Sequence, residues 1–131
     1  MNYVKSHSGN EYPRDPNTFI KHVDLINRCF YPNSVEEITD LLRREASPFA
    51  QHCLAKMQTN SQLSMKLALR LLREARTLDY KGALQNELKV SLNKLEDKDF
   101  DLGVSEILLK PRGGMADFVQ NVSEDQVKSY F

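Results

Sequence analysis

Residues 60–75 read NSQLSMKLALRLLREA, and this stretch decides the fold. Apolar side chains recur in it at spacings of three and four residues, which is the period of an α-helix. Two adjacent rows result, with Leu63, Leu67, Leu71 and Ala75 in one and Ala68, Leu72 and Ala75 in the other. A stripe this wide indicates a helix that neighbours contact on two sides. We therefore expect this helix to be the most buried of the fold and to serve packing, with Asn60 or Ser61 as its N-cap.

The composition bounds the function classes. The chain has 131 residues, enough for one domain with a modest core. Lysine plus arginine number 18, as do aspartate plus glutamate, so the formal net charge is zero. This balance argues against a general nucleic-acid binder, whose affinity depends on neutralising phosphates. No apolar run approaches the ~20 residues of a membrane-spanning helix, so we expect no membrane partner.

The usage of cysteine and histidine predicts neither a disulfide nor a metal site. Cys29 and Cys53 each lie inside an expected helix and form no CxxC pair, so we expect buried free thiols from a reducing compartment. His7, His22 and His52 are scattered without the spacing of metal ligands. The residues identify no catalytic group, and we predict no metal and no cofactor for this chain.

The chain divides into a polar N-terminal stretch and a helical domain. Residues 1–17 include three glycine or proline breakers and predict a tail or linker with little to bury, whereas residues 18–131 form the domain. The pattern predicts an all-α fold of about five helices. The main helices are expected over residues 18–30, 34–46, a segment from 47, 60–75 and 77–95. Residues 100–109 predict a helical turn, with a strand as the alternative, and residues 123–131 a short helix.

Polar residues mark where the helices begin. Residues 34–37, SVEE, and residues 123–126, SEDQ, match the capping box, in which a serine accepts a hydrogen bond from the amide three residues later. Ser47, followed by a proline, predicts a third cap of this kind. Thr77 is the expected cap of the helix over 77–95, and Asp101 is the expected cap of the turn after it.

Five segments, in order, resemble one family. Residues 26–38 resemble the pattern I-x-x-C-F … T/S-V-E-E-I, and residues 61–70 resemble S-P-x-S-L-K-I-T-L-R. Residues 87–91 resemble E-Y-R-L/M-S, residues 99–104 resemble D-F-x-E-G-V, and residues 122–131 resemble the usual ending. These patterns are those of the 3-hydroxyisobutyryl-CoA hydrolases, in the crotonase or enoyl-CoA hydratase superfamily. The resemblance covers nearly the whole chain but only the C-terminal third of the family.

The resemblance implies a helical part of an acyl-CoA thioester hydrolase of valine degradation. In that family the catalytic core lies upstream, with two backbone amides that stabilise the thioester oxyanion and an acidic residue that activates water. The chain would complete the acyl pocket and subunit contacts, meet acyl-CoA only through that core, and act in mitochondria. We expect the chain alone to be inactive toward acyl-CoA thioesters.

Departures from the family pattern keep a second function open. The family's E-G-V-R-A-x-L-I-D-K-D corresponds here to LGVSEILLK, residues 102–110, which lack the glutamate, the arginine and the following aspartate. The alternative is therefore a non-catalytic helical interaction module, or a structural subunit of a larger assembly such as a mitochondrial ribosome.

Association is expected under either function. The helices over 34–46 and 77–95 should cover one side of the helix over 60–75, the latter of the two with an apolar face of Leu84, Leu88, Leu92 and Leu95. Apolar surface beyond what soluble monomers tolerate remains elsewhere. We expect it to bind a crotonase-like catalytic core, another protein subunit or a second copy of the chain. The expected interaction residues are Phe19, Val23, Ile26 and Phe30 on the first helix, with Val104, Ile107 and Leu108 near the other end.

Overall fold

The structure is a computed structural model that describes residues 19–109 and 121–131, with side chains over 19–105 and 121–131. The all-α prediction is confirmed, because within these residues the chain forms one 3₁₀ helix, seven α-helices and no strand. The predicted tail, residues 1–17, lies outside the described residues. In chain order the elements are η1 (Ile20–His22), α2 (Val23–Cys29), α3 (Val35–Glu45), α4 (Pro48–Gln58), α5 (Gln62–Glu74), α6 (Tyr80–Leu95), α7 (Lys98–Leu109) and α8 (Glu124–Lys128).

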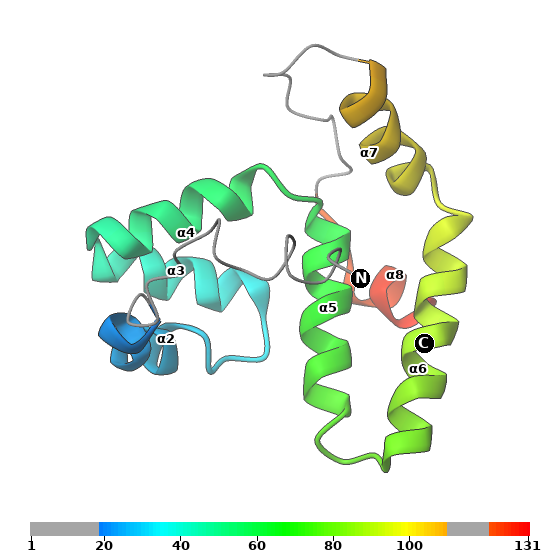
Figure 1. Ribbon diagram of the computed structural model, residues 1–131, viewed down its shortest axis with the longest axis horizontal. Helices are drawn as coiled ribbons and strands as arrows, with labels where there is room; N and C mark the ends of the chain where they lie inside the picture. Colours follow the sequence, from blue (N-terminus) through cyan, green and yellow to red (C-terminus); the bar gives the residue numbers. More distant parts are fainter. Residues whose placement is uncertain (1–18, 110–120) are drawn as a thin grey trace, which may run out of the picture.

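The helices form two groups that meet at α5 (Figure 1). In one group α2, α3 and α4 pack together. In the other, α5 and α6 run antiparallel, α8 packs against α5, and α7 continues beyond the end of α6. Each group encloses its own hydrophobic cluster, and contacts between α3 and α5 join the two groups.

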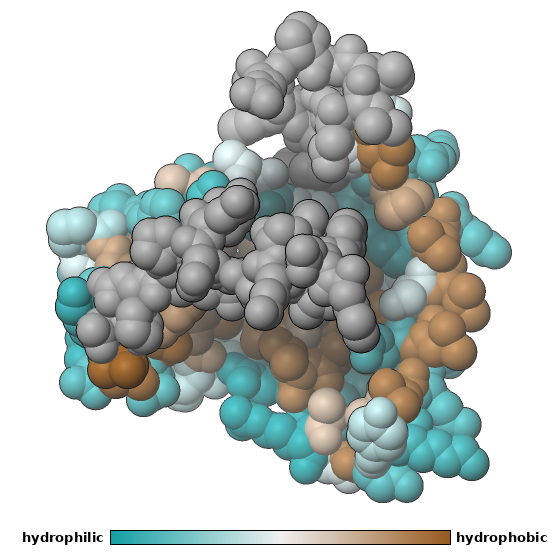
Figure 2. All heavy atoms as spheres, viewed as in Figure 1, coloured by the Kyte–Doolittle hydropathy of each residue, from teal (hydrophilic) through white to brown (hydrophobic). Residues whose placement is uncertain are grey.

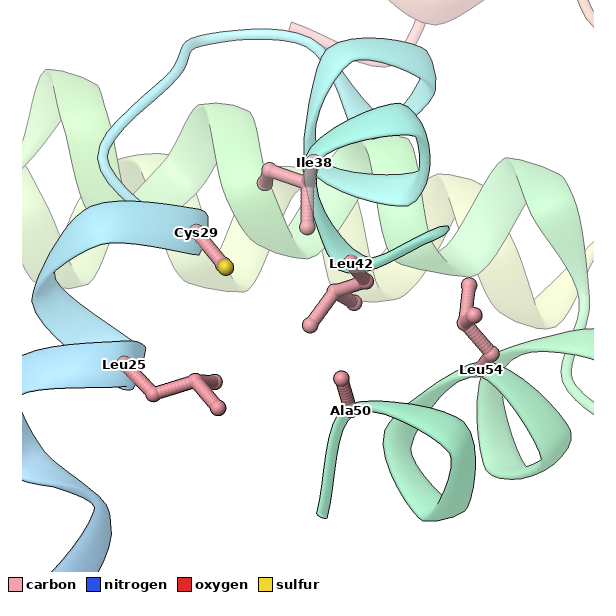
Figure 3. Close-up of a cluster of buried hydrophobic side chains, with 6 residues drawn as sticks. All are labelled: Leu25, Cys29, Ile38, Leu42, Ala50 and Leu54. Atoms are coloured by element: carbon pink, nitrogen blue, oxygen red, sulfur yellow. The ribbon is translucent and has the colours of Figure 1, made fainter. Parts of the chain in front are cut away.

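The first cluster fills the space between α2, α3 and α4, and its side chains point toward one another from all three helices (Figure 3). Its buried members are Leu25, Cys29, Ile38, Leu42, Ala50 and Leu54. After α3 the chain turns at Ala46, whose φ of 49° lies in the left-handed region. This conformation is strained for a residue with a side chain, and it lets α4 begin two residues later.

The second cluster joins parts of the chain that are far apart in sequence. Leu63 and Leu67 of α5 and Val90 of α6 pack with Val122 and Val127 from the C-terminal segment. All five side chains are at most 4% exposed. The C-terminal segment is therefore part of the core of this group.

The expectation that neighbours contact α5 on two sides is confirmed. Leu69 packs against the first cluster, whereas Leu63 and Leu67 lie in the second. The second predicted apolar row is wrong, because Leu72 is 68% exposed and Ala68 is exposed as well. The reason is that α3, α6 and α8 leave one sector of α5 facing solvent.

The prediction that this helix is the most buried is also wrong. The helix α3 buries Val35, Ile38 and Leu42, whereas α5 buries only Leu63 and Leu67. Because α3 lies between α2, α4 and α5, it loses more of its surface to neighbours than α5 does.

Four serine caps are confirmed. Each side chain accepts a hydrogen bond from the amide three residues later, which satisfies a donor that the helix itself leaves unpaired. The pairs are Ser34 with Glu37 (3.2 Å), Ser47 with Ala50 (3.2 Å), Ser61 with Ser64 (3.1 Å) and Ser123 with Gln126 (3.1 Å). Of the two candidates before α5, Ser61 is therefore the cap.

Two predicted caps are wrong: Asp79 takes the place of Thr77, and Asp97 takes the place of Asp101. Asp79 caps α6 by accepting a 2.8 Å hydrogen bond from the Gly82 amide, while the Thr77 hydroxyl donates back to a carbonyl of α5. A Cβ atom on Gly82 would stand 2.8 Å from the capping carboxylate, so the glycine leaves room for this cap. Asp97 rather than Asp101 precedes α7, and its carboxylate accepts from the second amide of that helix at 3.2 Å.

Candidate interaction surfaces

A buried polar network joins α5, α6, α7 and the end of the chain. The Asp99 carboxylate, whose side chain is 1% exposed, accepts hydrogen bonds from the Ser61 hydroxyl and, at 2.8 Å, from the Lys94 ammonium. Lys94 also lies 3.1 Å from Asp97, which accepts a 2.7 Å hydrogen bond from the Tyr130 hydroxyl. A general acid or base must reach its substrate. Because this carboxylate is enclosed, the network holds the segments together and is a poor candidate for catalysis.

Burial and hydrogen bonding hold two groups of this network in fixed protonation states. Burial alone would raise the pKa of Asp97, but hydrogen bonds from Tyr130, the Asp99 amide and Lys94 outweigh it and keep the pKa below the ordinary value of 3.8. Burial, followed by the hydrogen bond to Asp97, raises the pKa of Tyr130 to about 12. At neutral pH the carboxylate is therefore charged and the phenol is protonated, as their hydrogen bond requires.

Arg73 of α5 fixes the loop between α2 and α3. Its Nη2 atom donates to the carbonyls of Phe30, Tyr31 and Pro32 at 2.8, 3.0 and 2.9 Å. A helix leaves its last carbonyls without partners of its own, and this guanidinium supplies a donor at the end of α2. The contact therefore ties the two helical groups together.

Two further cations of α5 have internal partners. Lys66, whose side chain is 11% exposed, lies 2.7 Å from Glu36 and donates to the Val122 carbonyl at 2.8 Å. Burial opposes ionisation of Glu36, but hydrogen bonds from Lys66, from its own backbone amide and from Ser34, together with the charge of Lys66, outweigh it and lower the pKa of that carboxyl. The Arg70 guanidinium lies 4.5 Å from the centre of the Phe131 ring, in cation–π range. These contacts tie α5 to α3 and to the C-terminal segment.

A hollow of about 470 Å³ lies between α3, α4 and α5. Leu54, Met57 and Met65 contribute apolar walls, and Arg43 at the rim pairs with Asp40 at 2.8 Å. The hollow offers apolar contact, but its charged lining residues already have partners within the chain and do not select a ligand.

The expected inner face of α6 points outward, which corrects the sequence-based prediction. We call Leu84, Leu88, Leu92 and Leu95 the leucine row; these side chains are 46–60% exposed. Val90, which is 4% exposed, faces the second cluster in their place. The physical reason is that polar side chains on the opposite face of α6 make the hydrogen bonds to the rest of the chain.

The predicted interaction residues near the first helix are partly exposed. Phe19 is 74% exposed, and Ile20 and Val23 beside it are also exposed. Ile26 and Phe30 are half-buried, and Phe30 packs against the first cluster. The structure thus leaves Phe19 and Val23 exposed and draws Phe30 partly into the fold.

The other predicted interaction residues lie on α7. Val104 is exposed, as are Phe100 and Leu102, which the prediction did not include. The side chains of Ile107 and Leu108 lie outside the described residues. Helix α7 is separated from η1 and α2 in Figure 1, so the structure does not bring the two predicted faces together as one surface.

The two thiols do not form a reactive site. Both are free; Cys29 is buried as predicted, whereas Cys53 is only half-buried. Burial raises the pKa of both thiols, and a protonated thiol is a weak nucleophile. In the part of the chain that the structure describes, no group of three or more His, Cys, Asp or Glu residues is placed to hold a metal ion. Within the same part, no helix has both the length and the apolar character of a membrane span.

Comparison with known proteins identifies relatives over most of the chain. It is 34% identical over 117 residues to the mitochondrial 3-hydroxyisobutyryl-CoA hydrolase of Rattus norvegicus, covering 86% of this chain and 30% of the rat protein. It is 31% identical over 130 residues to the protein of that name from Homo sapiens, covering 95% and 33%. It is 35% identical over 122 residues to the mitochondrial 3-hydroxyisobutyryl-CoA hydrolase-like protein 1 of Arabidopsis thaliana, covering 86% and 30%.

These findings confirm the resemblance inferred from the five sequence segments. The chain spans about a third of the length of the curated relatives it matches. The sequence model of the enoyl-CoA hydratase/isomerase family matches residues 2–131. The chain therefore belongs to the enoyl-CoA hydratase/isomerase family.

Proposed function

We propose that the chain is the C-terminal helical part of an acyl-CoA thioester hydrolase and that it acts by packing against a catalytic core. The observation that carries this proposal is the alignment with the rat hydrolase, which takes in 86% of this chain but 30% of the relative. The rest of such a relative is long enough to hold a catalytic domain. Exposed apolar side chains on η1, α6 and α7 give this chain surface to bury against it.

In this proposal the helices support the chemistry without performing it. Hydrolysis of a thioester needs preorganised donors for the oxyanion and a group that activates water. The described residues contain no strand-to-helix turn that aims two amides at one point, and Asp99 is enclosed. The core supplies these groups, and the helices complete the wall of the acyl pocket and the subunit contacts. Because the relatives named above are mitochondrial proteins, we place this function in the mitochondrion.

A two-chain complementation experiment tests the proposal. The rat hydrolase is produced without the segment that this chain matches and is then mixed with this chain. Hydrolysis of 3-hydroxyisobutyryl-CoA is followed by the release of free coenzyme A thiol. The expected result is no turnover by this chain alone and a gain in activity or thermal stability of the rat core when the chain is added. The rat protein's own segment is the positive control. If that segment restores activity and this chain neither restores activity nor stabilises the core, the proposal is wrong.

A second candidate is a non-catalytic interaction module, including a subunit of an assembly such as a mitochondrial ribosome. It is favoured by the sequence LGVSEILLK at residues 102–110, which lacks the glutamate, the arginine and the following aspartate of the family pattern. Native purification of the chain from mitochondria distinguishes the candidates. Recovery in a large assembly without thioester hydrolysis supports this one, and recovery only as a free monomer contradicts it.

A further inference from the structure

The leucine row continues onto the next helix. Phe100 and Val104 of α7 are 40% and 38% exposed, and they follow the leucines of α6. Figure 2 shows hydrophobic residues along α6 and the start of α7, at one edge of the molecule. An apolar row that runs along one side of a helix in this way is a candidate binding site for another protein surface.

Polar contacts on the other face of α6 keep the leucine row turned outward. Asn86 donates to Glu74 of α5 at 3.0 Å, and Asn93 donates to the Tyr130 carbonyl at 3.0 Å. Lys94 binds Asp97 and Asp99, as described above. Residues two apart on a helix are separated by about 200° around its axis, so these polar residues lie opposite the leucines. Rotating α6 to bury the leucines would break all of these contacts.

The row also has a shape that suits an apolar partner. Near its first turn a hollow of about 290 Å³ is lined by Tyr80, Leu84 and Leu88, with Lys81 and Gln85 beside them. Tyr80 is 83% exposed, so its ring forms a wall of the hollow that stands in solvent. A large apolar side chain of a partner fits a hollow of this size, and the leucines beyond it extend the contact along α6.

The size of the row favours a tethered catalytic core over a second copy of the chain. A helix of 16 residues is about 24 Å long and about 10 Å wide, which gives a footprint of roughly 240 Å². A stable interface between separate proteins buries about 800 Å² per partner. In the relatives this helical segment and the remaining two thirds belong to one polypeptide. A contact within one polypeptide is helped by the high effective concentration of its two sides and tolerates the smaller area.

We propose that the leucine row, extended by Phe100 of α7, is the surface on which this chain meets the crotonase-like catalytic core. The proposal rests on the function proposed above and names the surface that the function uses. It assigns the principal contact to α6, whereas sequence reasoning assigned it to η1, α2 and α7 and placed the leucine row in the interior.

The test uses the complementation mixture with three variants of the full chain. Leu88→Glu and Leu92→Glu place a charge in the middle of the row, and Leu72→Glu is the matched control. Leu72 is as exposed as these leucines but lies on α5, outside the row. Because the chain and the rat core are not tethered in this mixture, affinity is measured by titration calorimetry at high protein concentration, alongside the recovered hydrolase activity and with the rat protein's own segment as the reference. We expect Leu88→Glu and Leu92→Glu each to weaken binding at least tenfold and Leu72→Glu to change it less than twofold.

The variants are first compared alone by circular dichroism and thermal unfolding. Because the leucines are exposed and glutamate favours helices, all three should unfold within a few degrees of the unmodified chain. If the unmodified chain binds the core and Leu88→Glu and Leu92→Glu bind equally well, the leucine row is not the contact, although the proposed function stands. If the unmodified chain does not bind while the rat segment does, both proposals are wrong. If the unmodified chain is a dimer that Leu88→Glu converts to monomers with core binding unchanged, the row joins two copies and the inference is overturned.

Discussion

Replacing Leu67 by alanine should destabilise the fold strongly, whereas the same change at Leu72 should not. Both leucines lie on α5, but Leu67 is 3% exposed in the second cluster and Leu72 is 68% exposed. Large-to-small changes of a buried leucine cost about 2–5 kcal/mol. The second cluster has five buried members among the described residues and can relax in part, so we expect about 3 kcal/mol for Leu67→Ala. A surface change such as Leu72→Ala stays within about 0.5 kcal/mol.

Urea unfolding followed by circular dichroism measures both changes. With a slope of about 1.5 kcal/mol per M, a loss of 3 kcal/mol lowers the urea midpoint by about 2 M. Leucine and alanine have similar helix propensities, so the difference between the two variants reports burial. Leu71→Ala, at a half-buried position, should fall between them. Equal midpoints for Leu67→Ala and Leu72→Ala would refute the assignment of Leu67 to the core and the packing role of α5.

Four further predictions concern polar contacts and the backbone. Arg73→Ala should cost about 2 kcal/mol in urea unfolding, because it leaves three carbonyls without their charged donor, and Arg76→Ala at an exposed position should cost almost nothing. The pKa of Asp97 is lowered in the folded state, so its stabilising contribution is present above the unfolded pKa of 3.8 and is lost as the pH falls through the folded pKa. Asp97→Asn should therefore reduce the loss of stability at acid pH in a profile of unfolding free energy against pH. The pKa of Tyr130 is raised to about 12, so its contribution is present below pH 10 and is lost as the pH rises toward 12, and Tyr130→Phe should remove that alkaline loss. Ala46→Gly should increase the free energy of unfolding by up to about 1 kcal/mol, because glycine adopts the left-handed conformation without strain, and should therefore raise the thermal midpoint. An unchanged or lower midpoint would show that the conformation of Ala46 costs no stability.

Local signals in the sequence predicted the helices well. A serine cap depends only on residues within one turn of the helix start, so it can be recognised from the local sequence. The four caps at Ser34, Ser47, Ser61 and Ser123 are present in the structure. The recurrence of apolar side chains every three or four residues also identified the helices themselves. Thr77 was expected in place of Asp79, and Asp101 in place of Asp97, because more than one acceptable cap lies near the start of each helix and the choice depends on where the helix can start.

The orientation of α6 could not be predicted from its own residues. Periodicity finds the apolar face of a helix but does not say what that face meets, and here the contacts within the chain are made by Asn86, Asn93 and Lys94. The network around Asp99 was missed for a related reason. Its partner Ser61 lies 38 residues earlier, and no local pattern relates the two.

The distribution of the two clusters along the chain orders their assembly during synthesis. The members of the first cluster all lie between Leu25 and Leu54, whereas the second needs Val122 and Val127, and the contact of Lys66 with the Val122 carbonyl spans 56 residues. Ribosomes add about 5–20 residues per second, so the roughly 70 residues between the two closures take about 4–14 s. Once α5 has been made, its inner side has no C-terminal segment to cover it for the rest of that interval. The nascent chain is therefore most exposed to chaperones, and to aggregation, after its first cluster has folded.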